Sequence, residues 1–220
     1  MRRRSRGPTD TQQAVALQCA SLLLDYPDAA LYGRLPLLRS AAERLPADAA
    51  TALLAMVSYL EGTDQHAAEL AYVDLFDLRR RCCLFLTYYA YGDTRKRGMA
   101  LLRFTHAYKQ AGLVLGPDEL PDHLAVVCEF AATADLAAGL RLLTEHRAGL
   151  ELIRLALTDL GSPYMHALDL VRAVLPELSA GDLAKALELA STGPPAEEVG
   201  LEPFAPPEYM GAGDLAAVRR

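Results

Sequence analysis

The sequence predicts an all-α protein, a single-domain bundle of about eight to ten helices. Alanine and leucine dominate the composition, tryptophan is absent and β-branched residues are few, a balance that favours helix over strand. Apolar residues recur three and four positions apart, which is the period of an amphipathic helix. The chain has 220 residues, of which 52% are hydrophobic, so one core can form without a disulfide or a metal.

The ends of the chain differ in composition from its middle. Residues 1–9 are basic, residues 10–192 carry the helical pattern, and residues 193–220 are acidic and rich in proline. We expect the first segment to be disordered and the last to be an extended tail. MRRRSR followed by the apolar run Ala14–Leu24 resembles a signal peptide, but Asp10, Gln12 and Gln13 interrupt the approach to that run and no small-residue cleavage site follows it. The cytoplasm is therefore the expected compartment, without a membrane span.

Four helices are predicted in the first third. Thr9, Asp10 or Thr11 can cap a helix over residues 11–25, which Pro27 ends. A short helix is expected near residues 28–33. Another is predicted from Pro36 to Leu45, since proline is favoured in a first turn. The fourth covers residues 48–61, where Gly62 is a candidate C-terminal cap.

The remaining helices follow from the same signals. Thr63 and Asp64 begin a helix that enters the segment 72–103. Cys82–Tyr91 is rich in aromatic residues and could be a strand, but it lacks obvious partner strands and is interpreted as a buried helix that ends at Gly92. Further helices are predicted at residues 94–111, 123–133, 135–160 with a possible break at Gly149, 162–174 and 179–190.

Charge is distributed unevenly along a chain whose formal net charge is −6. Residues 79–103 carry seven basic residues and one acid, whereas residues 193–214 carry five acids and no base. Arg79, Arg80 and Arg81 could bind phosphates, a nucleotide-like cofactor or an acidic partner, or simply offset the dipole at a helix C-terminus. Arg95, Lys96 and Arg97 lie in a helix's first turn, where cations are unfavourable, which favours an external partner or internal acids that offset their charge.

Patterns typical of enzymes and metal sites are missing from the sequence. It contains no phosphate-binding loop, no GxGxxG and no recognisable nucleophile motif. The four cysteines, including the adjacent pair Cys82 and Cys83, show no zinc-ligand spacing and are interpreted as buried free thiols. The five histidines form no metal-binding pair. The sequence therefore contains no recognisable catalytic motif and no metal-site pattern. A helical enzyme whose titratable groups converge only in the folded protein stays a further hypothesis.

Three acidic residues flank the apolar helix predicted at 123–133, namely Glu119, Asp122 and Glu129. One interpretation is structural: Asp122 caps the helix, and Glu129 forms an internal ion pair with an arginine. The other is that the three form the acidic wall of an apolar groove that holds a basic, hydrophobic peptide. Such a groove takes its affinity from apolar area and its register from charge.

Two segments give the chain a resemblance to a known family. YVDLFDLRRRCCLFLTYYAYGDTRKRGMALLRF and ELPDHLAVVCEFAA resemble the NarJ family, the assembly chaperones of respiratory nitrate reductase within the TorD/DmsD-like group. The second segment contains the E-x-P-D-H element of that wider group, at Glu119, Pro121, Asp122 and His123. The resemblance covers about residues 12–190; the basic N-terminus and the acidic tail fall outside it.

The resemblance implies an all-helical chaperone without catalytic activity. It implies that the protein binds the N-terminal region of the apo catalytic subunit and holds it for insertion of the molybdenum cofactor and an iron–sulfur cluster before membrane docking. No cofactor is expected to stay bound to the chaperone, and molybdenum cofactor biosynthesis proteins are possible further partners. The expected binding residues are Tyr72, Phe76, Asp77, Arg79, Arg80, Tyr88, Tyr89, Asp93, Arg95, Arg97, Glu119, Pro121, Asp122, His123 and Glu129.

The alternative hypothesis uses the basic face instead. On that interpretation the protein is a helical scaffold or regulator that binds nucleic acid or phosphate ligands. Salt distinguishes the two hypotheses, because phosphate-driven binding weakens steeply with ionic strength. Binding in an apolar groove weakens less.

Overall fold

A computed structural model describes residues 7–116, 119–177 and positions 181, 184 and 188. This part of the chain forms ten α-helices and no strand, so the all-α prediction is confirmed. The expected disordered N-terminus, the acidic tail and most of the predicted helix 179–190 lie outside the described residues. None of the described helices is both long and apolar enough to span a membrane.

The first four helices are α1 (Asp10–Leu24), α2 (Ala29–Ala41), α3 (Ala47–Glu61) and α4 (Gln65–Tyr72). Thr9 begins α1 with a capping box, and Asp28 and Asp64 cap α2 and α4 through their side chains. The predicted break before Pro36 is wrong: α2 runs through it, and a 3₁₀ turn follows at Ala42–Arg44. Pro36 is exposed, while Leu31, Leu35 and Leu38 form one buried stripe across it, so packing overrides the local signal.

The middle of the chain is less regular. A π-helix at Val73–Asp77 and a 3₁₀ turn at Arg80–Cys82 lead to α5 (Leu86–Tyr91) and α6 (Arg95–Gln110). The predicted continuous helix Cys82–Tyr91 is therefore wrong in its first half. Residues 83–85 are extended, and Phe85 forms an isolated antiparallel bridge with His123. The predicted end is confirmed, since Gly92 follows α5 with a φ of 56°, where glycine is favoured.

The last four helices are α7 (Leu124–Thr133), α8 (Leu136–Glu145), α9 (Arg147–Asp159) and α10 (Met165–Val174). The expected break within residues 135–160 occurs at His146 rather than at Gly149. Gly149 lies inside α9, where a Cβ atom would sit 3.1 Å from the Tyr89 ring. This glycine therefore lets α9 approach α5 closely.

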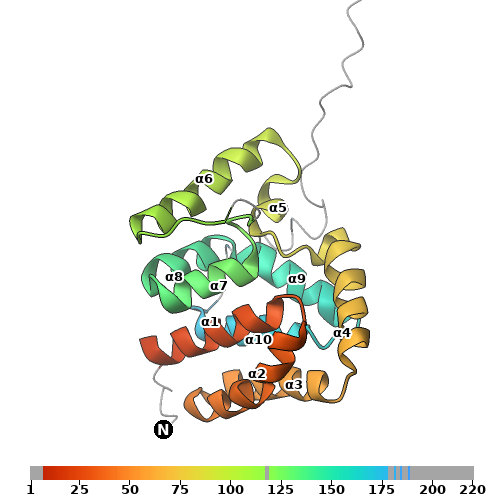
Figure 1. Cartoon of the computed structure of the whole chain (residues 1–220). Helices are drawn as coiled ribbons and strands as arrows, with labels where there is room; N and C mark the ends of the chain where they lie inside the picture. The colour runs from red at the N-terminus through yellow and green to blue at the C-terminus, as the bar shows by residue number, and fades with distance from the viewer. Residues whose placement is uncertain (1–6, 117–118, 178–180, 182–183, 185–187, 189–220) are drawn as a thin grey trace, which may run out of the picture.

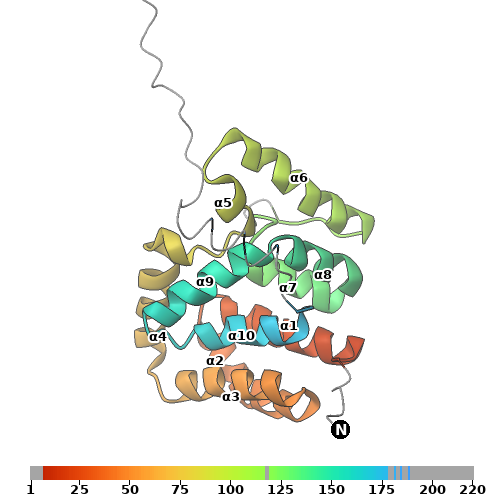
Figure 2. The ribbon, with the colours of Figure 1, turned by 180° about the vertical axis from the view of Figure 1, so that it is seen from behind.

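The helices stack in layers, with α2 and α3 at one end of the molecule and α6 at the other (Figures 1 and 2). Near the centre, α1 packs against α7 on one side and against α10 on the other. Since α7 is apolar on nearly every face, it is buried between neighbours as expected. The C-terminal end of α1, the start of α7 and the extended residues 83–85 meet at one surface.

Candidate functional site

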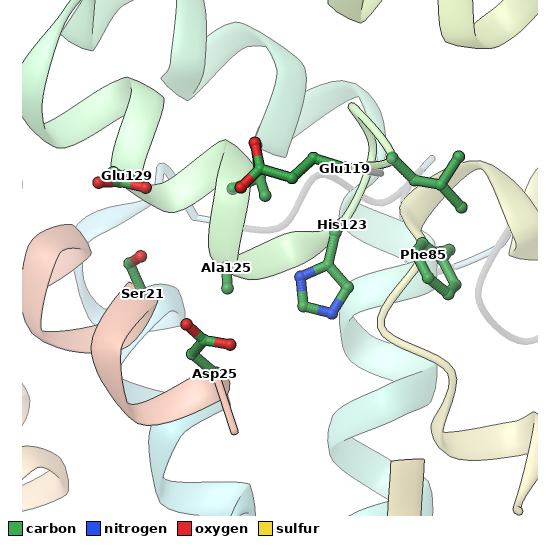
Figure 3. A pocket seen from close by; sticks show the side chains of 9 residues that line it. Ser21, Asp25, Phe85, Glu119, His123, Ala125 and Glu129 are labelled. Carbon is green, nitrogen blue, oxygen red and sulfur yellow. The ribbon is translucent and has the colours of Figure 1, made fainter. Parts of the chain in front are cut away.

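A pocket of about 290 Å³ opens where these segments meet. Figure 3 shows its side chains coming from the end of α1, the extended segment, the loop before α7 and α7 itself. Three segments far apart in sequence therefore build one site. The pocket is lined by Ser21, Asp25, Phe85, Glu119, Leu120, His123, Ala125, Val126 and Glu129.

The wall of this pocket is acidic. Asp25, Glu119 and Glu129 reach it from three different elements, and all three are exposed (Figure 3). None forms an ion pair with a described residue, and the lining contains no arginine or lysine. Phe85 and Val126 add apolar surface between the carboxylates. The pocket is therefore suited to a ligand that is both cationic and apolar.

His123 lies between the acidic and the aromatic parts of the pocket. Its ring makes an edge contact with Phe85, with centroids 5.3 Å apart. Burial lowers the pKa of His123 below its usual value, although nearby carboxylates, chiefly Asp25, oppose this effect. The imidazole is therefore mostly neutral near pH 7 and presents a polar but uncharged group to a ligand.

Backbone pairing fixes the positions of Phe85 and His123. The Leu86 N–H donates to the Asp122 carbonyl at 3.0 Å, and the Leu124 N–H donates to the Leu84 carbonyl at 2.9 Å. These two bonds flank the Phe85–His123 bridge. The aromatic side of the pocket is thus held by main-chain contacts, which do not depend on side-chain rotamers.

Asp122 points away from the pocket and into the protein. It is fully buried, and its carboxylate accepts hydrogen bonds from the backbone N–H and the hydroxyl of Thr87. The suggestion that Asp122 caps the helix after it is wrong, since α7 has no side-chain cap. Asp122 instead satisfies a free N–H in the first turn of α5, because the chain reversal at 119–123 brings it there. It does not line the acidic wall.

Arg97 joins this buried network from α6. Its Nη2 lies 3.8 Å from Asp122, its Nε donates to the Thr87 hydroxyl at 3.1 Å, and Asp93 accepts at 3.3 Å. The guanidinium also lies 5.5 Å from the centre of the Phe85 ring. Internal acids therefore offset the unfavourable position of Arg97 in the first turn of a helix, which was one of the two alternatives expected from the sequence.

Three aromatic residues expected at the binding surface are used inside the protein. Tyr72 and Phe76 are buried with Tyr164 in an aromatic cluster, and the Tyr72 hydroxyl donates to the Leu24 carbonyl at 3.0 Å. Tyr89 is buried against α9 and donates to the carbonyls of Arg81 and Cys83. Tyr88 is half-buried beside it. None of the four lines the pocket.

The remaining expected residues are scattered. Arg79 pairs with Asp74 at 2.7 Å and also bonds its carbonyl, as a cation near a helix C-terminus can. Pro121 is buried, and its carbonyl accepts from Tyr108. Four others are exposed outside the pocket: Asp77, Arg80, Asp93 and Arg95. Of the fifteen predicted binding residues, Glu119, His123 and Glu129 are brought together at the pocket.

Sequence reasoning missed Ser21, Asp25 and Phe85 as pocket residues. Nothing in the local sequence indicates that the end of the first helix, where Ser21 and Asp25 lie, is beside α7. No group of three or more possible metal ligands occurs among the described residues. Cys19, Cys82 and Cys128 are buried free thiols there, and burial raises the pKa of each, so they pack as small apolar groups.

Comparison with known proteins gives a consistent set of relatives. NarX of Mycobacterium tuberculosis, a nitrate reductase-like protein, is 42% identical over 69% of this chain, and the match spans 23% of NarX. The Escherichia coli nitrate reductase molybdenum cofactor assembly chaperone NarJ is 36% identical over 54% of this chain and 51% of its own length. The probable Bacillus subtilis NarJ chaperone is 26% identical over 75% of this chain and 90% of its own length.

A family model described as the nitrate reductase delta subunit matches residues 42–169. The matched region includes α5, α6, the E-x-P-D-H element and α7, and thus most of the pocket. The resemblance to NarJ that the sequence indicated is confirmed. This chain belongs to the nitrate reductase delta subunit family.

Proposed function

We propose that this protein is a cytoplasmic assembly chaperone of nitrate reductase, and that its acidic pocket binds the N-terminal region of the apo catalytic subunit. The names of its NarJ relatives support the chaperone role. On this proposal the client, while held, receives the molybdenum cofactor and its iron–sulfur cluster. The chaperone is not an enzyme and retains no cofactor. Cofactor biosynthesis proteins are its second class of partner.

One observation carries the pocket assignment. Asp25, Glu119 and Glu129 surround apolar surface, and no described cation neutralises them. Three carboxylates kept close together repel one another unless a ligand brings positive charge. A basic, amphipathic peptide supplies that charge together with apolar side chains for Phe85 and Val126.

The size of the pocket indicates how such a peptide binds. A volume of about 290 Å³ lies just below the range of about 300–1,000 Å³ that is usual for small-molecule sites. It therefore accommodates a few anchoring side chains, while the rest of the peptide lies along the surface between α1 and α7. The neutral His123 beside Phe85 is placed to hydrogen-bond a backbone or side-chain group of the peptide.

Titration calorimetry tests the proposal. The ligand is a synthetic peptide that copies about the first twenty residues of the nitrate reductase catalytic subunit from the same organism, a length suited to groove binding. A scrambled peptide and a DNA duplex serve as controls. We expect specific binding with a negative heat-capacity change, as burial of apolar surface requires. If heat of binding were measured only with the DNA duplex, and if that binding weakened steeply as the salt concentration rose, the basic-face hypothesis would be supported instead.

Charge-removing variants locate the site. The triple variant Asp25→Asn, Glu119→Gln and Glu129→Gln should weaken peptide binding about tenfold, since each exposed charge contributes about 0.2–1 kcal/mol. Glu43→Gln removes an exposed acid in the turn between α2 and α3, outside the pocket lining, and is the control. Equal affinity of both variants and the unmodified protein would move the peptide away from this pocket.

A further inference from the structure

The outer face of α6 is a second surface, opposite in charge to the pocket. The helix has 16 residues, of which five are cations and none is acidic, in a chain whose formal net charge is −6. It lies at one end of the molecule in both views of the ribbon (Figures 1 and 2). The five cations are Arg95, Lys96, Arg97, Arg103 and Lys109.

The same helix exposes apolar side chains. Phe104 and Tyr108 anchor its inner face in the core, whereas Met99 is 69% exposed and Leu102 is 56% exposed on its outer face. A shallow hollow of about 510 Å³ lies along this outer face. It is lined by Met99, Leu102, Arg103, Thr105, His106 and Lys109. Apolar surface bordered by cations and without an acid is typical of a docking site.

Lys96 and Lys109 are the lysines that α6 leaves for a partner: Lys109 lines the hollow, and Lys96 is exposed three residues before Met99. Arg97 turns inward to Asp93 and Asp122, and Arg103 pairs with Glu145 of α8 at 2.8 Å. Neither lysine forms an ion pair within the described part of the chain, and both are exposed. The face therefore presents two charges and two apolar side chains together.

We propose that the acidic C-terminal segment of this same chain, residues 197–214, docks on the outer face of α6. The segment carries five acids and no base, which complements a hollow whose lining contains Arg103 and Lys109 and no acid. Leu201, Phe204, Tyr209 and Met210 alternate with the acids and provide apolar groups for Met99 and Leu102. The segment thereby shields a surface that otherwise attracts acidic partners.

The length of the chain allows this contact. The continuously described chain stops at Glu177, so 24 residues lead from residue 178 to Leu201. They span about 36 Å even at a helical rise of 1.5 Å per residue and about 80 Å if extended. A domain of this size is about 40 Å across. Tethering gives an effective concentration near 1 mM, so a contact with a Kd of about 0.1 mM is occupied about 90% of the time.

The distribution of lysines makes the proposal easy to test. Lys96, Lys109 and Lys185 are the three lysines of the whole sequence, and two of them lie on α6. A carbodiimide joins an amine to a carboxylate only when the two are in contact. In the full-length protein we expect amide cross-links from Lys96 or Lys109 to Glu202, Glu208 or Asp214, identified by peptide mass spectrometry. High salt should reduce their yield several-fold.

Two variants, and a mixture of isotopically labelled and unlabelled protein, distinguish the possible occupants of the α6 surface. Leu102→Ser should lower the yield at least threefold, while Leu70→Ser, at a comparably exposed leucine of α4, should leave it unchanged. Equal yields in both would overturn the apolar part of the proposal. Cross-links that join isotopically labelled to unlabelled chains would overturn it in favour of an interface between copies. Absence of α6 cross-links, with binding to anionic lipid vesicles, would assign the face to a membrane surface.

Discussion

Two glycines show how differently two regions of this molecule, the α7–α8 contact and α6, are packed. Gly139 lies in α8, where an added Cβ atom would sit 2.2 Å from the Cβ of Ala131 in α7. Gly98 lies in α6, where an added Cβ atom would meet nothing within 4 Å. The body that supports the acidic pocket is therefore close-packed around α7, whereas α6 is open on its outer face.

The strongest test of this contrast is Gly139→Ala. The new methyl group would overlap both the Cβ and the Cα of Ala131, and a backbone atom cannot move aside without separating α7 from α8. We expect a loss of at least about 3 kcal/mol of unfolding free energy, after the gain in helix propensity of about 1 kcal/mol is counted. Urea denaturation followed by circular dichroism measures it. An unchanged midpoint would show that α7 and α8 are not in close contact.

Asp122 and His123 are neighbours in sequence, but Asp122 points into the protein interior and His123 lines the pocket. Substituting each one separates a structural role from a role in binding. Asp122→Ala would leave the buried Thr87 N–H and the Arg97 charge without their shared partner. We expect a loss of about 2–3 kcal/mol in unfolding free energy. His123→Ala should weaken peptide binding and cost less stability.

Asp122→Asn is the control for that experiment. It keeps an oxygen that accepts from Thr87 and removes only the charge, so about 1 kcal/mol should be lost. Calorimetry with the peptide and urea denaturation are run on all three variants. If Asp122→Ala lowered peptide affinity at full stability, Asp122 would belong to the binding surface after all.

Local sequence signals predicted most of the helices, but they predicted only part of the pocket. Caps such as Thr9 and Asp64 and the stop at Gly92 act within a few residues, so the sequence predicts them. Glu119, His123 and Glu129 lie within one short stretch and could be grouped. Asp25 could not be grouped with them, because only the packing of α1 on α7 brings it near.

Long-range contacts also explain why the predictions for Asp122 and for residues 83–85 were wrong. Asp122 was expected to cap its own helix, but its partner Thr87 lies 35 residues away. The extended residues 83–85 looked helical because their pairing partner, His123, is not part of any strand. Neither contact leaves a periodic pattern in the sequence, so propensity alone could not have found them.

His146 links the two parts of the molecule, because its ring packs against Phe104 of α6 at 5.1 Å between centroids. Burial lowers the pKa of His146 below its usual 6.5, although Leu142 and nearby acids oppose this. The unfolded chain therefore binds the proton at a higher pH than the folded one. The stability contributed by neutral His146 is complete above about pH 6.5 and is lost as the pH falls toward its folded pKa.

We therefore expect His146→Gln to flatten the dependence of the unfolding free energy on pH between about pH 7.5 and 5. Urea denaturation across this range measures the change. His66→Gln is the control, because the His66 side chain is 76% exposed. Parallel profiles for His146→Gln and the unmodified protein would mean that α6 leaves the ring accessible to water.

The smallest expected change in stability comes from Gly98→Ala, which tests whether the outer face of α6 is open. Gly98→Ala adds a methyl group to the exposed interior of α6, where nothing lies within 4 Å. Alanine restricts the unfolded chain and favours helix, so we expect a gain of about 0.5–1 kcal/mol. Tail cross-linking to Lys96 and Lys109 should persist, because the helix keeps its outer side chains. A destabilised Gly98→Ala protein would show that α6 is covered at this position, and the contrast with Gly139 would then disappear.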